Sequence, residues 1–275
     1  MAGDIFYHYT DFQALDGILR CAQLRVNNVL NMNDSAEMRH FMRRLAKAIV
    51  RQLEDGGDKA RAAVVGALFQ EELRKEHSAF AACFSFRRDD AAQWERYGNR
   101  GRGVCIAVRG ELLRKMAVGP LSLHTVFYED DMTGHPMVDH FCRLVQGKDE
   151  LSGEDPDVRM AMRDAWACSV AFKHPSFSSE DEVRLVVAPF GNEAFDVKAC
   201  YHVSKERIKK YYPLELRDMC RKAGTTLEEL IEEIIIGPES TQSKVILQDY
   251  LSDQGMEALA GRVALSDCPL RGVPS

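Results

Sequence analysis

The segment YHYTDFQALDGIL, residues 7–19, places a histidine at the end of an extended stretch, directly before a helix. Alternate residues of a strand share a face, so Phe6, His8 and Thr10 point one way while Tyr9 points the other way. His8 is therefore expected at the end of a strand, beside the start of a helix. A single histidine in such a place usually packs at an edge and bonds a backbone carbonyl. A functional role requires partners from other parts of the chain.

The helix that follows has a clear start signal. Thr10 and Gln13 have the spacing of a capping box, in which a hydroxyl and an amide satisfy the first free N–H groups of a helix. Phe12, Leu15 and Ile18 then supply a buried stripe at helical spacing. We therefore expect this helix to fix the position of the strand end that carries His8.

Length and composition place limits on the fold and the cellular setting. The 275 residues, 45% of them apolar, suffice for one large domain or two small ones. The formal charge of -6 provides no general attraction to nucleic acid, although a local basic patch could still provide one. The eight cysteines are too widely spaced for CxxC metal motifs. Without a signal peptide or a long apolar run, the sequence predicts a cytoplasmic protein with reduced thiols.

The hydrophobic pattern predicts strands on both sides of each helical block. Strands are expected at 4–9, 24–29, 79–86, 103–108, 121–129, 182–189, 198–203, 209–216, 232–237 and 262–266. Helices are expected at 10–19, from a cap at Asp34 or Ser35 to Leu53, and at 59–77, 89–98, 136–147, 157–172, 217–231 and 241–253. We therefore predict an α+β fold with a mixed, mostly antiparallel sheet. It forms a single domain, residues 1–275, with helical insertions at about 34–77 and 136–172.

A second informative block is ACFSFRRDDAAQWERYGNRGRGVCIAV, residues 82–108. Ser85 lies near the end of its first strand, and Tyr97 closes its short helix. Trp94 shares a helical face with Tyr97 and is expected to pack on the sheet. The glycines of GNRGRG, residues 98–103, are in the wrong order for a dinucleotide-binding fingerprint and follow a helix, so they predict a turn.

The third block is KHPSFSSEDEVRLVV, residues 173–187. If Val183 faces the core, strand alternation sends Glu182 and Arg184 to the opposite face and makes Glu180 a neighbour of Glu182. Two carboxylates on one face repel each other, which raises the pKa of one of them. On an isolated strand, the same residues would instead form an exposed ladder of glutamate and arginine.

Taken together, these blocks resemble known families. A strand with a histidine and a helix of the form HxTxxxxLxxIL, then a strand with a tyrosine, then a glutamate that begins a strand, is the order found in ADP-ribosyltransferases of the histidine, tyrosine, glutamate type. The chain is also similar to the widespread bacterial family catalogued as domain of unknown function 2971. The matching segments are FYHYTDFQALDGILRCAQLRVNNVLNMNDSAE, the block at 82–108, SEDEVRL, EEIIIGPES and VALSDCPLR. That family often carries tryptophan where this chain has Phe177.

The resemblance implies a sheet core of the ADP-ribosyltransferase type and the use of NAD as a substrate. The chain would transfer ADP-ribose to an unknown protein or nucleic-acid acceptor, or to water as an NAD glycohydrolase. The alternative is a non-catalytic nucleotide-sensing or partner-binding module of a bacterial stress or phage-defence system, because a fold alone does not determine an activity. Such systems imply a cognate antitoxin or a defence protein as partner. No membrane partner is expected.

The resemblance also implies roles for individual residues. Glu182 would stabilise the oxocarbenium charge that develops on the ribose, and Glu180 would orient the acceptor. His8 would hold ribose hydroxyls, while Tyr97 or Tyr9 would stack on the nicotinamide. The further cofactor-binding residues are Thr10, Ser85 and Arg184, and the candidates for neutralising the pyrophosphate are Arg184, Arg100 and Arg102. Each arginine is equally compatible with a solvated surface charge.

A metal-dependent hydrolase is a weaker interpretation. The segment HPMVDH, residues 135–140, spaces two histidines by five residues, which is off the helical face that an i, i+4 zinc motif uses. The other histidines form no ligand pair with an adjacent acid. We therefore expect no metal site.

Overall fold

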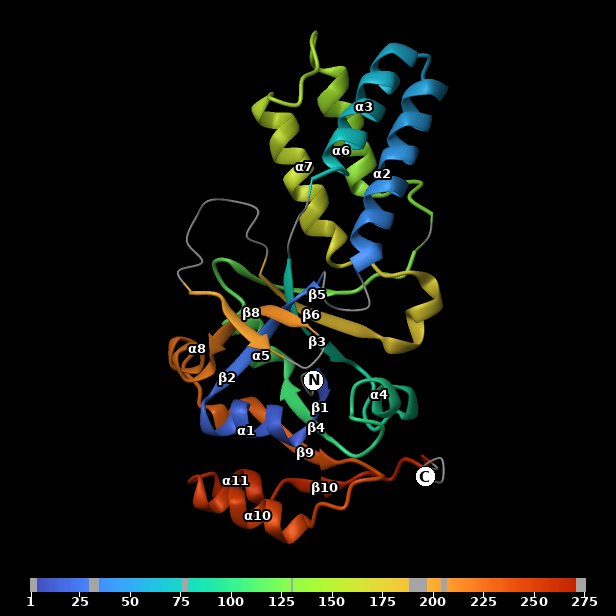
Figure 1. The fold of residues 1–275 in the computed structure, drawn as a ribbon. Coiled ribbons are helices and arrows are strands. Elements are labelled where there is room, and N and C mark those ends of the chain that lie inside the picture. Colours follow the sequence, from blue (N-terminus) through green and yellow to red (C-terminus); the bar gives the residue numbers. More distant parts are fainter. Residues whose placement is uncertain are drawn as a thin grey trace.

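A computed structural model of the chain describes residues 4–29, 35–75, 79–129, 131–187, 197–203 and 207–270. Its strands are β1 (Ile5–Thr10), β2 (Gln23–Asn28), β3 (Phe80–Ser85), β4 (Val104–Arg109), β5 (Leu121–Thr125), β6 (Glu182–Val187), β7 (Cys200–Val203), β8 (Ile208–Glu215), β9 (Ile231–Ile236) and β10 (Val263–Leu265). Its helices are α1 (Phe12–Arg20), α2 (Ser35–Asp55), α3 (Lys59–Glu72), α4 (Ala91–Arg96), α5 (Gly110–Met116), α6 (Pro136–Gln146), α7 (Pro156–Ser169), α8 (Leu216–Lys222), α9 (Leu227–Leu230), α10 (Lys244–Asp253) and α11 (Glu257–Ala260), with a 3-10 helix η2 (Pro175–Glu180). The predicted α+β class is confirmed (Figure 1).

The sheet forks at β3. The strand order is β10-β9-β4-β1-β3-β2-β8-β7, and a branch from β3 adds β6 and then β5. Every pairing of these strands is antiparallel except that of β9 with β10, as the predicted mixed, mostly antiparallel sheet requires. One edge of β3 pairs with β6 along its whole length. The other edge meets β1 only at Ser85 and β2 only at Phe80 and Ala81, so β1 and β2 diverge between these points.

Helix α1 connects the two diverging strands. It begins after Asp11, whose carboxylate accepts a 2.7 Å hydrogen bond from the backbone N–H of Ala14. The predicted cap at Thr10 is wrong, because Thr10 is the last residue of β1 and pairs with Val104 of β4. Asp11 takes the role one residue later, as an acidic side chain can at any helix start. The helix buries Leu15 on its inner face.

Two apolar cores lie on opposite faces of the sheet. Helices α2, α3, α6 and α7 contact one another and stand together on one side (Figure 1), so the two predicted helical insertions pack against each other. The first core contains Val183 and Leu185 of β6, as predicted, and the second contains Val186. Because both faces of β6 are covered, the exposed glutamate and arginine ladder does not form.

Several predicted element boundaries differ from the structure. The helix predicted at 217–231 is two helices, because Gly224 adopts a positive φ of 70° between them and Thr226 begins α9 with a capping box. Helices α5 and α11 were not predicted. The predicted cap at Asp34, residues 76–77 of the predicted second helix and residues 188–189 of the predicted sixth strand lie outside the described residues. None of the described helices is both long enough and apolar enough to cross a lipid bilayer.

Candidate functional site

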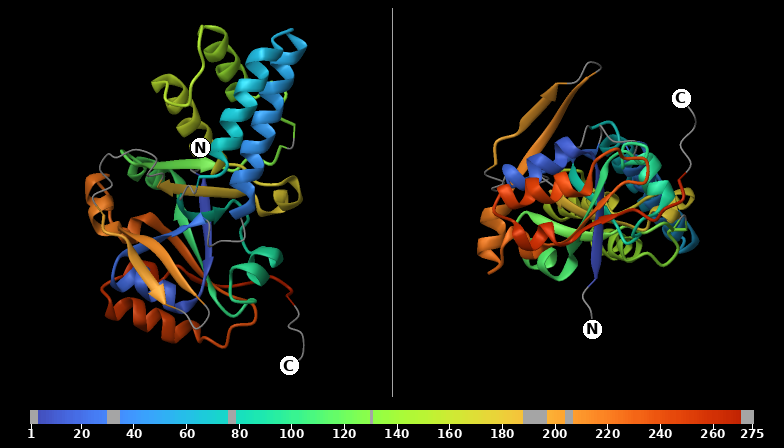
Figure 2. Two further views of the ribbon diagram at one scale, coloured as in Figure 1. Left: turned by 45° about the horizontal axis from the view of Figure 1, so that its top comes forward. Right: turned by 90° about the horizontal axis from the view of Figure 1, so that it is seen from below.

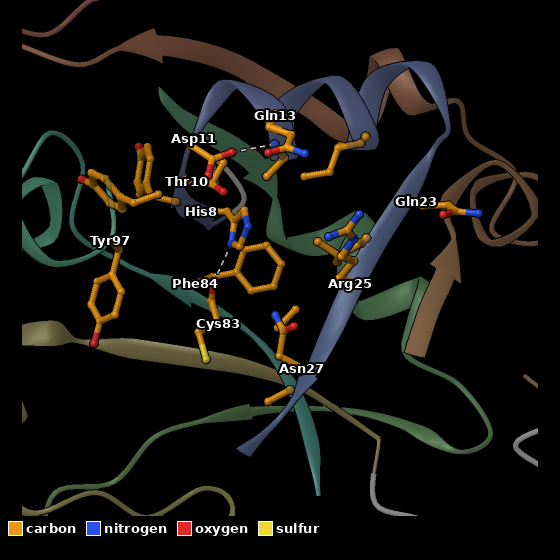
Figure 3. A pocket seen from close by; sticks show the side chains of 18 of the residues that line it. His8, Thr10, Asp11, Gln13, Gln23, Arg25, Asn27, Cys83, Phe84 and Tyr97 are labelled. Carbon is orange, nitrogen blue, oxygen red and sulfur yellow. Dashed lines mark hydrogen bonds between the residues drawn. The ribbon is translucent and has the colours of Figure 1, made fainter. Parts of the chain in front are cut away.

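A cavity of about 560 Å³ opens at the fork of the sheet. Its wall is built from β1, α1, β2, β3 and α4, with η2, the start of β6 and the β7–β8 hairpin completing it. Figure 3 shows His8 in the middle, Tyr97 on one side, and Arg25 and Gln23 on the other. A volume of this size is typical of small-molecule and cofactor sites.

Most of the residues predicted from the sequence meet at this cavity. The lining includes His8, Tyr9, Thr10, Tyr97, Glu180 and Glu182. Ser85 and Arg184 are buried beside it and are not among its lining residues, and neither are Arg100 and Arg102. Three segments that are far apart in the sequence therefore converge, because β3 lies between the strand that carries His8 and the strand that begins with Glu182.

The side chain of His8 reaches a backbone carbonyl at the point where the fork separates β1 from β2. Its Nδ1 lies 2.8 Å from the carbonyl oxygen of Cys83, on the edge of β3 between β1 and β2 (Figure 3). Because a carbonyl only accepts hydrogen bonds, Nδ1 carries the proton and donates. Burial lowers the pKa of His8, which favours the neutral ring. The neutral tautomer leaves Nε2 as an acceptor, suited to a ligand hydroxyl.

The two predicted acids lie together around a buried lysine. Lys173 Nζ donates to Glu180 Oε2 at 2.6 Å and to Glu182 Oε2 at 3.2 Å. Arg184 forms a bidentate pair with Glu182, with Nε donating to Oε1 at 2.8 Å and Nη2 donating to Oε2 at 3.0 Å. All four side chains are buried. The prediction that Glu180 and Glu182 are neighbours is therefore confirmed.

These cations determine the charge of Glu182. Burial alone would raise the pKa of Glu182, but the charges of Arg184 and Lys173 outweigh it and hold the pKa below its ordinary value. Repulsion between the two acids therefore does not raise the pKa of Glu182. The physical reason is that Lys173 lies between the carboxylates and compensates both of them.

Glu180 links the buried charges to the open part of the cavity. Its Oε1 accepts a 2.6 Å hydrogen bond from Arg96 Nη1 and a 3.1 Å hydrogen bond from the hydroxyl of Tyr97. Both donors come from the end of α4, which Asp90 caps with bonds to the backbone N–H groups of the first turn. Tyr97 is 39% exposed, so one end of this network is accessible to a ligand.

The structure distinguishes the two candidate tyrosines. Tyr9 is only 6% exposed, and its ring packs edge-on against Trp94 with 4.9 Å between centroids. Its hydroxyl donates to the carbonyl of Arg87 at 2.7 Å and accepts from the N–H of Asp90 at 3.0 Å. Trp94 is buried on the sheet, as predicted. Tyr97 is therefore the more accessible of the two tyrosines.

The side chains of Ser85 and Arg184 form hydrogen bonds with other residues of the protein. The Ser85 hydroxyl donates to the backbone carbonyl of Glu180 at 2.6 Å, and Gln93 donates to the same carbonyl at 3.1 Å. These bonds fix the turn that carries Glu180. Arg184 holds Glu182 and also donates to the carbonyl of Val170 at 2.8 Å. The structure therefore places both side chains where they orient the acids and not where they touch a ligand in the cavity.

Sequence reasoning missed the residues at the other end of the cavity. Arg25 of β2 lies at that end (Figure 3), and Lys209 and His202 of the β7–β8 hairpin also line the cavity. The guanidinium of Arg25 lies 4.8 Å from the ring centroid of Tyr211. Alternating polar residues on β2 were the available signal. The cavity therefore has a carboxylate end and a basic end, which suits an elongated ligand with hydroxyl groups and an anionic part. Within the described ranges, no group of three His, Cys, Asp or Glu side chains is placed to hold a metal ion.

Comparisons with known proteins agree with part of the sequence resemblance. A family model described as protein of unknown function (DUF2971) matches residues 93–185, the stretch that contains Tyr97, Lys173 and both glutamates. The match supports the resemblance to that family. No curated protein and no solved structure matches the chain.

Proposed function

We propose that the chain binds NAD in the cavity at the fork and breaks the bond between nicotinamide and ribose, passing ADP-ribose to an acceptor or to water. The observation that supports this most strongly is the convergence of His8, Tyr97 and Glu182 on one cavity from three separate segments. The order of these residues is that of ADP-ribosyltransferases, and their side chains suit the parts of NAD that react.

Glu182 is the proposed electrostatic partner of the reacting ribose. It keeps its negative charge, because its pKa is held below the ordinary value, and Arg184 fixes its orientation with two hydrogen bonds. A carboxylate held in this way stabilises developing positive charge without reorganising during the reaction. Removing such a partner typically raises the barrier by about 3–4 kcal/mol.

The other residues position the substrate. Tyr97 is partly exposed at the cavity and is the proposed stacking partner of the nicotinamide, and the neutral ring of His8 offers Nε2 to a ribose hydroxyl. Glu180, next to Tyr97, orients the acceptor. At the far end, Arg25 and Lys209 suit the pyrophosphate, the role that the sequence assigned to Arg184 and to arginines after α4.

Nicotinamide release tests this proposal. Purified protein is incubated with NAD, and the Glu182→Gln variant is compared with Glu232→Gln, which removes an acid that is paired with Arg109 at the surface. We expect nicotinamide release to fall by about 100-fold or more for Glu182→Gln and to stay unchanged for Glu232→Gln. NAD should also raise the Tm of all three proteins. The proposal is wrong if wild-type protein neither gains stability from NAD nor releases nicotinamide.

One observation favours a second candidate, a nucleotide-sensing module without turnover. Every carboxylate oxygen of Glu180 and Glu182 has a basic partner, since Arg96 binds one oxygen of Glu180 and Lys173 and Arg184 bind the other three. Such compensation weakens the negative potential that would stabilise a developing positive charge on the ribose. This candidate predicts a rise of Tm with NAD but no nicotinamide release by the wild type.

A further inference from the structure

The β7–β8 hairpin stands out from the body of the protein beside the cavity. Figure 2 shows its two strands, in orange, extending away from the rest of the sheet. β8 pairs with β2 along residues 23–27, and β7 pairs only with β8 among the described strands. The three β7 residues after Cys200 are all exposed.

The hairpin is basic in an otherwise acidic chain. The described residues of this region, 198–203 and 207–212, contain four lysines and arginines and no aspartate or glutamate, whereas the whole chain has a formal charge of -6. Lys198 and Arg207 are exposed, and Lys209 and Lys210 are partly buried. This concentration of positive charge favours a polyanionic partner at this one place.

Exposed aromatic and apolar side chains accompany these charges. Tyr201 is 62% exposed and lies directly across the ladder from Lys210. Near the tip, Val203 and Ile208 pair with each other and are 70% and 63% exposed. A tyrosine ring beside a lysine is a combination on which single-stranded nucleic acids bind, with a base stacked on the ring and a phosphate at the cation.

The opposite face of the hairpin leads into the cavity. His202 and Lys209 are cross-strand partners, and both line the cavity together with Arg25. Positive charge thus continues from the exposed hairpin to the basic end of the cavity, whose other end holds Glu180 and Glu182. Lys209 on this face and Lys210 on the other face give the hairpin a basic side chain on each side, and one of these sides borders the cavity.

We propose that the β7–β8 hairpin docks a single-stranded nucleic acid that accepts the ADP-ribose. This rests on the proposed function. An oxygen or nitrogen of the nucleotide forms a bond to the ribose C1′ of NAD, the bond to nicotinamide breaks, neutral nicotinamide leaves, and the acceptor loses one proton to a base or to water. A single strand is required because a paired base must leave the duplex before it can enter a pocket.

Fluorescence anisotropy with labelled RNA and DNA of about 12 nucleotides, measured without NAD, tests the docking. Wild-type protein should bind the single strands more tightly than a duplex, with an affinity that falls as salt rises. Lys198→Glu combined with Arg207→Glu, and Tyr201→Ala separately, should each weaken binding by about tenfold or more. The matched control combines Lys47→Glu with Lys59→Glu, which lie on exposed positions of α2 and α3 and should leave binding unchanged.

Nicotinamide release into water separates this inference from the proposed function. The hairpin variants should release nicotinamide from NAD as the wild type does, because none of their positions lines the cavity. The inference is overturned if wild-type protein consumes NAD but does not bind oligonucleotides, if the hairpin variants bind them like the wild type, or if ADP-ribose is attached to a protein and not to the strand. Oligonucleotide binding that depends on the hairpin, with no NAD binding or consumption, would instead overturn the proposed function and keep the docking surface.

Discussion

Lys173 is the residue on which the arrangement of the two acids depends. It is buried and donates to both glutamates, and its ammonium also lies 5.2 Å from the ring centroid of Phe177. Glu182 has a second cation in Arg184, whereas the additional partner of Glu180 is Arg96, which is partly exposed. Removing Lys173 therefore leaves buried negative charge only partly compensated.

We predict that Lys173→Met lowers the free energy of unfolding by about 3–5 kcal/mol, because breaking a buried ion pair from one side leaves an uncompensated charge. Lys222→Met is the control, since Lys222 pairs with Asp218 at the surface and its side chain is 72% exposed. Its loss should be below about 1 kcal/mol. Urea denaturation followed by circular dichroism measures both. Similar losses for the two variants would contradict the role given to Lys173.

The sequence located part of this residue network but not its internal pairing. The motif order was enough to select His8 and both glutamates, and it left the stacking tyrosine open between Tyr97 and Tyr9. Strand alternation placed Arg184 on the face of Glu182, but no local pattern shows whether an arginine binds a ligand or its neighbour. Lys173 was missed because its importance arises only when the fold buries two acids around it. A buried Glu-x-Glu pair that requires a cation was the one available signal.

At the scale of elements, the cavity exists because two strands share one edge of β3. The positions of the strands followed from hydrophobic alternation, and most of them were predicted within a few residues. The fork could not be predicted in the same way. It depends on which distant strands pair with β3, and side-chain periodicity within each strand does not encode that pairing. The cap of α1 was misplaced by one residue for a related reason: Thr10 is held in β1 by its pairing with β4.

The end of β1 is held in place by a close approach of the backbone at Gly103. A Cβ atom at this position would lie 2.1 Å from the carbonyl oxygen of Thr10 and 2.9 Å from that of Gly98. We predict that Gly103→Ala displaces the strand end next to His8, costs about 1–3 kcal/mol of stability and weakens NAD binding. Urea denaturation and the rise of Tm with NAD measure the two effects.

Gly66→Ala provides the comparison for this variant. Gly66 lies inside α3, where a Cβ atom would meet only a side-chain carbon of Val50 at 3.8 Å. Alanine should stabilise the helix by about 1 kcal/mol, because it restricts the unfolded chain more than glycine does. An unchanged response to NAD in Gly103→Ala would show that the end of β1 does not position the site.

At the scale of the whole molecule, the class of fold and the long helices between residues 35 and 72 and between 136 and 169 were predictable, since both depend on composition and periodicity over long windows. The packing of these helices into one four-helix group on one face of the sheet was not predictable from the sequence. Neither was the division of the interior into two cores, because covering both faces of β6 requires partners from distant segments. Partial burial of histidine side chains also determines how stability depends on pH.

Burial lowers the pKa of His8, and it also lowers the pKa values of His124 and His135. Below about pH 6.5 the unfolded chain takes up protons at these positions that the folded protein does not. The free energy of unfolding should therefore keep its full value above that pH and should fall as the pH decreases towards 5.5. Urea denaturation at a series of pH values measures this slope.

Substitution separates the contribution of His8. His8→Gln removes one of the groups that resist protonation and should make the decrease between pH 7 and pH 5.5 shallower. His140→Gln, at an exposed position of α6, should leave the slope as it is in the wild type. A slope that is the same in all three proteins would contradict a lowered pKa of His8.

The most direct test of the account is a crystal structure of the Glu182→Gln variant with NAD bound, because that variant should retain the substrate. We expect the nicotinamide ring against Tyr97, the adjoining ribose within hydrogen-bonding distance of His8 and of residue 182, and the pyrophosphate near Arg25 and Lys209. NAD bound outside the cavity at the fork, or bound with its nicotinamide at the basic end, would contradict it.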